Sequence, residues 1–82
     1  MRGGVSGIRN AFHAAVRQNL DHVTIDVIAK DSLDRIADSV QLAFERYTEI
    51  RTTIILKGAK AVEVTRDDYQ AGKILAVLQD SL

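Results

Sequence analysis

The chain has 82 residues, of which 46% are hydrophobic, and its eleven basic residues are balanced by eleven acidic ones. This length predicts one small domain, and the hydrophobic fraction excludes a disordered chain. The zero net charge excludes a strongly basic nucleic-acid binder, and the absence of cysteine excludes disulfide and thiolate sites. There is neither a bilayer-spanning apolar run nor a signal peptide after Met1, so we expect a cytoplasmic protein without membrane association.

The first part of the chain predicts a helix followed by a strand. Residues 1–6 include two glycines, and we expect them to be flexible. From residue 7 to about residue 19, apolar side chains recur at helical spacing. In residues 22–29, Val23, Ile25 and Val27 alternate with other residues at the period of a strand.

The second predicted helix has the clearest pattern in the chain. Asp31 or Ser32 offers an N-cap, and an apolar stripe with i, i+3, i+4, i+7 spacing follows. Polar and charged residues fill the opposite face. The stripe consists of Leu33, Ile36, Ala37, Val40, Ala43, Phe44 and Tyr47.

The last third of the chain predicts a hairpin and a helix. Residues 50–57 are rich in β-branched side chains, Gly58 tolerates the positive φ of a tight turn, and residues 61–64 form a returning strand. Thr65 and Asp68 have the spacing of a capping box, and the helix that they open is expected to run almost to the terminus. Gly72 inside this helix is interpreted as a close backbone approach. The fold class is therefore α+β, one domain over residues 1–82, with the order α-β-α-β-β-α and helices packed against a small sheet.

Candidate catalytic and metal-ligating residues all have a structural explanation. His13 and His22 lack the spacing of a zinc site. Three aspartates on one stripe of the second helix are able to chelate a cation or act as an acid–base pair, but a helix N-terminus favours carboxylates, and Arg35 neutralises them. These residues are Asp31, Asp34 and Asp38. We therefore predict no enzymatic activity, no metal and no cofactor.

Some apolar residues lie away from the predicted core stripes and predict an interface. Leu42 falls outside the inner face of the second helix, and Ile28 and Ile55 fall opposite the main alternation of their strands. Tyr69, which we expect to pack across the start of the last helix, completes this set. A chain of this length buries a thin core, so we predict a homo-oligomer, most simply a dimer.

With the order β-α-β-β-α from His22 onward, the chain resembles the Phd/YefM family of bacterial antitoxins. The closest likeness is the stretch from Ile54 to Tyr69, with a turn glycine, a short valine-rich strand and an acidic-acidic-tyrosine helix start. Ser32-Leu33-Asp34-Arg35 fits the family's Ser-x-x-Arg sequence, although Arg17-Gln18-Asn19-Leu20 also matches its arginine-to-leucine segment. The extra N-terminal helix, the longer segment between Arg35 and Gly58, and the stop at Leu82 depart from the family pattern.

The resemblance implies a dimer that binds operator DNA through its N-terminal part and a toxin through its C-terminal end. The residues expected to contact DNA are Arg17, Lys30, Ser32 and Arg35. We therefore expect a non-catalytic binding module, an antitoxin-like DNA-binding transcriptional regulator that also binds a protein partner. The alternative is a small interaction or assembly module, such as a phage or mobile-element component, that forms a homo-oligomer without binding nucleic acid.

Overall fold

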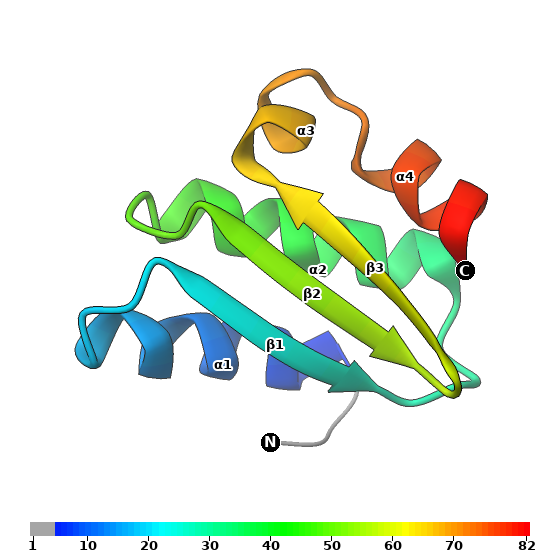
Figure 1. Cartoon of the computed structure of the whole chain (residues 1–82), viewed down its shortest axis with the longest axis horizontal. Helices are drawn as coiled ribbons and strands as arrows, with labels where there is room; N and C mark the ends of the chain where they lie inside the picture. The colour runs from blue at the N-terminus through cyan, green and yellow to red at the C-terminus, as the bar shows by residue number, and fades with distance from the viewer. Residues whose placement is uncertain (1–4) are drawn as a thin grey trace.

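The computed structural model describes residues 5–82 and shows a three-stranded sheet packed on a layer of helices (Figure 1). The predicted α+β class and element order are confirmed, with one additional helix at the C-terminal end. No helix in this part of the chain combines the length and the apolar character needed to cross a membrane. The elements are α1 (Val5–Arg17), β1 (His22–Val27), α2 (Leu33–Arg46), β2 (Thr52–Lys57), β3 (Lys60–Thr65), α3 (Arg66–Gln70) and α4 (Ile74–Ser81).

The strand order in the sheet is β1-β2-β3. Strands β1 and β2 are parallel, with His22 opposite Thr52, and α2 is the crossover that a parallel pair requires. Strands β2 and β3 form an antiparallel hairpin that brings Thr52 opposite Thr65. Gly58 in the turn has a φ of 62°, as its position in the sequence predicts. Strands β1 and β3 are therefore the two edges of the sheet.

The core lies between one face of the sheet and the helices. Phe12 of α1 and Phe44 of α2 are fully buried and meet edge to face, with ring centroids 5.3 Å apart. The predicted stripe of α2 is confirmed, because five of its residues are buried in the structure. The sheet contributes its inward-facing side chains, which are Val23, Ile25, Val27, Thr53, Ile55, Val62 and Val64.

The opposite face of the sheet carries no helix from residues 5–82. In Figure 1 the strands pass in front of α1 and α2, which lie on the buried side. We call this uncovered surface the open face. Its side chains alternate with the buried ones and are half-buried or exposed: His22, Thr24, Asp26, Thr52, Ile54, Leu56, Ala61, Glu63 and Thr65.

The helix termini follow the predicted capping chemistry at α2 and α3. The Ser32 hydroxyl accepts a hydrogen bond from the Arg35 N–H at 3.3 Å, which selects Ser32 over Asp31 as the N-cap of α2. Thr65 and Asp68 form the reciprocal capping box at α3. Both assignments explain why these helices begin where the sequence indicates.

The prediction of one long C-terminal helix is wrong. The chain leaves helical geometry after α3 at Gly72, whose φ is 70°, and α4 starts at Ile74. A Cβ at Gly72 would meet no atom within 4 Å, so the glycine serves the left-handed backbone and not a close approach. At the other end, α1 already includes Val5 and Ser6, and the flexibility expected of residues 1–4 lies outside the described part of the chain.

Candidate binding groove beside strand β1

Strand β1 presents backbone hydrogen-bonding groups along an edge of the sheet to which residues 5–82 add no further strand. The Asp21 carbonyl accepts hydrogen bonds from the N–H groups of Arg51, at 2.6 Å, and Thr52, at 3.4 Å, and thus points toward β2. Backbone groups of successive residues in an extended strand point to opposite sides. The N–H and C=O groups of His22, Thr24 and Asp26 therefore point away from β2, toward the free edge.

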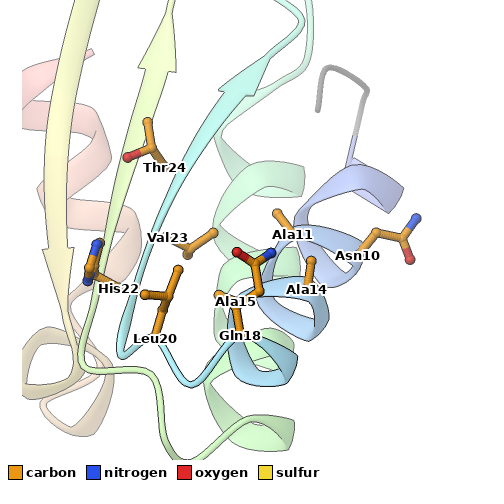
Figure 2. A pocket seen from close by; sticks show the side chains of 9 residues that line it. All are labelled: Asn10, Ala11, Ala14, Ala15, Gln18, Leu20, His22, Val23 and Thr24. Carbon is orange, nitrogen blue, oxygen red and sulfur yellow. The ribbon is translucent and has the colours of Figure 1, made fainter.

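A groove of about 330 Å³ runs between this edge and α1, and Figure 2 shows the side chains that line it. We call it the α1–β1 groove. Leu20 belongs to its lining with 40% of its surface exposed, and Leu42 is the other large apolar side chain in residues 5–82 that is exposed. The lining residues are Asn10, Ala11, Ala14, Ala15, Gln18, Leu20, His22, Val23 and Thr24.

The groove combines small apolar side chains with neutral polar ones. Ala11 and Ala14 occupy the helical wall, and their size leaves space between α1 and β1. Asn10 and Gln18 supply amide groups that both donate and accept hydrogen bonds. Within the part of the chain that the structure describes, no lysine, arginine, aspartate or glutamate belongs to the lining. Such a surface suits a peptide backbone with uncharged side chains better than it suits a charged metabolite.

The turn from α1 into β1 places Leu20 at this site. Asn19 adopts a left-handed conformation with a φ of 60°, which asparagine tolerates better than most residues. The Leu20 N–H then donates to the Ala15 carbonyl at 2.9 Å. Leu20 lies at helical spacing from Val16, but this turn takes it out of the helix and leaves it exposed.

The four residues expected to contact DNA lie in two separate places. Arg17 ends α1 at the side where β1 begins, whereas Lys30, Ser32 and Arg35 surround the start of α2, beyond the other end of β1 (Figure 1). A six-residue strand separates the two groups, which corresponds to about 20 Å. All four residues are exposed, but they do not form one patch on a single chain.

Two of the four predicted interface residues, Leu42 and Ile28, differ in how much of their side chains is exposed to solvent. Leu42 is 58% exposed on the outer side of α2, beside a groove of about 320 Å³ that Arg9, Glu45 and Arg46 also line. Ile28 is half-buried just after β1. Leu42 is thus available to a partner, and the interface role of both residues stays a prediction.

The other two predicted interface residues pack inside the molecule. Ile55 is 0% exposed and faces the helices, so its placement on an outer face is wrong. Ile54 and Leu56 are the apolar residues that β2 turns outward. Tyr69 is half-buried and stacks on Phe44, with ring centroids 5.7 Å apart, which joins α3 to α2.

The two histidines do not converge with the acidic residues of α2. The His13 Nδ1 lies 3.5 Å from the Tyr47 hydroxyl, and the His22 Nδ1 lies 3.2 Å from the Asp21 carboxylate. Among residues 5–82 there is no group of three or more histidine, cysteine, aspartate or glutamate side chains placed to hold a metal ion. A scan against protein-family models found no match, and searches of curated proteins and of solved structures found none either.

Proposed function

We propose that this protein is a non-catalytic binding module that accepts an extended segment of a protein partner as an additional strand beside β1. The observation that carries the proposal is the coincidence of outward-pointing backbone groups at His22, Thr24 and Asp26 with the uncharged α1–β1 groove. In strand addition, main-chain hydrogen bonds supply affinity, and pockets for alternate side chains supply specificity.

The two edges of the sheet differ in how they are protected. Strand β3 carries Lys60 and Glu63 and contacts both α3 and α4. Strand β1 carries one charged residue, Asp26, and no lysine, and the helix that it contacts is α1. Its register with β2 is unbroken from His22 to Val27, so no bulge turns the edge away. Proteins usually protect free edges with charges, bulges or coverage. The weaker protection of β1 favours it as the binding edge.

The groove also indicates what the added strand looks like. Alternate side chains of that strand would point toward α1, where Ala11 and Ala14 leave room for apolar groups of moderate size. Leu20 would lose its exposure to water on binding, which adds a hydrophobic contribution. Because α1 already lies behind this edge, the partner needs to supply a strand and no covering helix.

The test compares one proline substitution at each edge of the sheet. In Thr24→Pro the lost N–H points to the free edge, so pairing with β2 is retained. Glu63→Pro is the matched control on β3, because the Arg66 N–H donates to the Arg51 carbonyl and the backbone of Glu63 therefore also points outward. Peptides selected from a displayed random library should lose about tenfold or more in affinity for Thr24→Pro and keep it for Glu63→Pro.

Hydrogen exchange identifies the bound edge directly. A selected peptide should slow exchange of the backbone amides of His22, Thr24 and Asp26, because these groups would become hydrogen-bonded. Peptides that bind while these amides stay unprotected, or that lose affinity equally in both proline variants, would contradict strand addition at β1.

A second candidate function is operator binding by an antitoxin-like regulator. The observation in its favour is that α1 contains no acidic residue and carries Arg9 and Arg17, while Lys30 and Arg35 are exposed beside the start of α2. Helix N-termini and basic side chains both favour phosphate. A dimer in which a toxin or another protein binds elsewhere would fit the same proposal.

DNA binding is tested with a duplex from the region upstream of the protein's own gene. Fluorescence anisotropy should show affinity that falls steeply as salt rises, and Arg17→Glu and Arg35→Glu should each weaken binding and reduce the salt slope. Asp38→Asn, on the exposed face of α2, is the control and should not weaken binding. Absence of binding at low salt would exclude this function.

A further inference from the structure

The open face has an apolar centre with one carboxylate on each side. Ile54 and Leu56 project from the central strand β2 and are half-buried. In the observed register, Ile54 lies between Thr24 and Glu63, and Leu56 lies between Asp26 and Ala61. Asp26 on β1 and Glu63 on β3 are both exposed. The outward side chains of the three strands include no lysine or arginine, so this face is acidic.

The parallel pairing of β1 and β2 makes an uncovered face unusual. Sheets with parallel strands normally carry helices on both faces, because each crossover helix covers one of them. Here the helical layer described in residues 5–82 covers one face and leaves Ile54 and Leu56 in contact with water. The open face of the sheet is thus the place where a second layer of helix would pack.

The size of the open face matches a single helix. Strands of six residues span about 20 Å, and the two outer strands lie roughly 10 Å apart. An α-helix is about 10–12 Å wide with its side chains, and about 13 residues span 20 Å. One helix of three to four turns, aligned with β2, would cover the apolar centre and reach the carboxylates on both sides.

We propose that the open face binds a basic amphipathic helix of a partner protein. An apolar stripe at i, i+3, i+4, i+7 packs on Ile54 and Leu56, and lysine or arginine residues on both borders of that stripe pair with Asp26 and Glu63. The charge of the face selects a basic helix, since an acidic one would place like charges opposite each other. The apolar centre and the two carboxylates of this site are not among the residues that line the α1–β1 groove, so the inference goes beyond strand addition.

A second copy of this chain does not fit the open face equally well. Helix α1 is basic, with Arg9, His13 and Arg17 on one exposed stripe. However, its apolar residues, such as Ile8 and Phe12, are fully buried in its own core and are not available to Ile54 and Leu56. Helix α1 of a second copy therefore does not supply the complementary helix.

The probe is a pair of synthetic helical peptides of about 14 residues with the same leucine stripe. One peptide has lysine on both borders of the stripe, and the other has glutamate at the same positions. Calorimetry should show that the lysine peptide binds at least about tenfold more tightly than the glutamate peptide, and that this difference shrinks as salt rises. In labelled protein, the amide shifts of Ile54 and Leu56 should move on binding. Equal affinities, or shifts confined to the Leu42 side of α2, would overturn the proposal.

Variants of the protein separate charge selection from folding. Asp26→Asn with Glu63→Gln keeps the shapes of both side chains and should reduce the preference for the lysine peptide at least about threefold. The matched control, Asp38→Asn with Glu45→Gln, removes two carboxylates from the exposed face of α2 and should leave the preference unchanged. Equal effects of both pairs would overturn the proposal. Leu20→Ala removes an apolar side chain from the α1–β1 groove and none from the open face. It should weaken strand addition and leave binding of this peptide unchanged, so strand addition and helix binding fail independently.

Discussion

Thr53 places an unsatisfied hydroxyl in the core. Its side chain is 0% exposed, and within residues 5–82 its Oγ1 has no hydrogen-bond partner. Val64 lies opposite it on β3, and Ile55 is the next inward residue of β2. A hydroxyl in such apolar surroundings loses its hydrogen bonds to water without replacement, which lowers the stability of the fold.

Thr53→Val should therefore stabilise the protein by about 1 kcal/mol, because the two side chains have nearly the same shape and valine has no polar group to satisfy. The free energy of unfolding from urea titration measures the effect. Thr52→Val, on the open face, is the control and should change stability by less than about 0.5 kcal/mol. A loss of stability in Thr53→Val would show that the hydroxyl is hydrogen-bonded.

Arg66 is a buried cation that closes the C-terminal end of α2. It is 8% exposed; its Nε donates to the Ile50 carbonyl at 2.8 Å, and its Nη2 donates to the carbonyls of Phe44, at 3.0 Å, and Tyr47, at 2.9 Å. The guanidinium also lies over the rings of Phe44 and Tyr69, at 5.0 and 5.5 Å. One side chain thereby joins α3 to the end of α2.

Arg66→Ala should cost about 3 kcal/mol, because it removes three hydrogen bonds to backbone carbonyls and the contact of the guanidinium with two aromatic rings. Arg66→Lys should recover part of that loss, since an ammonium group cannot reproduce the planar arrangement of donors. Urea unfolding followed by circular dichroism provides the measurement. Arg46→Ala is the exposed control, and an effect of equal size there would contradict the role given to Arg66.

At the scale of elements, the break at Gly72 determines where α4 starts. The Lys73 N–H donates to the Asp68 carbonyl at 2.8 Å, and the Gly72 N–H donates to the Tyr69 carbonyl at 3.1 Å, so α3 ends in a turn with a left-handed glycine. This turn orients α4 so that Ile74 and Leu78 are buried against the core.

Gly72→Ala should destabilise the fold by about 1 kcal/mol, because the space is free but the positive φ is unfavourable for a residue with a Cβ. Gly72→Asn should cost less, since asparagine tolerates this conformation better. Thermal and urea unfolding both report the change. If alanine were neutral at this position, the left-handed turn would not be needed.

The sequence predicted the helices and strands well, because caps, turns and apolar stripes each depend on residues that are only a few positions apart. The caps at Ser32 and Thr65, the turn at Gly58 and the stripe of α2 all have this character. The helix break was missed because the apolar residues on both sides of Gly72 fit one continuous stripe. A glycine in that pattern looks the same whether it is inside a helix or just after one.

The candidate site was not predictable, because it depends on pairing between distant segments. The run from Ile54 to Leu56 is apolar at every position, so the sequence does not show which face points inward. That choice is made by the register with β1 and β3. Likewise, the outward-pointing backbone groups of Thr24 remain unpaired within residues 5–82 because β1 is an edge strand, which is a property of the whole sheet.

At the scale of the whole molecule, apolar packing and not ion pairing holds the fold together. Across residues 5–82, the one contact between an acidic and a basic side chain joins the His22 Nδ1 to the Asp21 carboxylate at 3.2 Å, and both side chains are largely exposed. Exposed pairs of this kind contribute little to stability. The buried core, in contrast, extends from α1 through the sheet to α4.

The free energy of unfolding should therefore change by less than about 0.5 kcal/mol between roughly 50 and 300 mM sodium chloride. Urea titrations at several salt concentrations measure this directly. A decrease of more than about 1 kcal/mol at the higher concentration would indicate a network of charges that contributes more than the geometry suggests.

The two strand pairs of the sheet, β1 with β2 and β2 with β3, differ in the length of the chain segment that connects the paired strands. Strands β2 and β3 meet across a tight turn, whereas the segment between His22 and Thr52 contains the whole of α2. Closing the longer loop is slower and has a greater entropic cost. Strand β1 is thus expected to join the sheet late in folding and to leave it early in unfolding. A ligand bound along that strand would therefore lower the rate constant of unfolding, and the native state would persist longer while the ligand is bound.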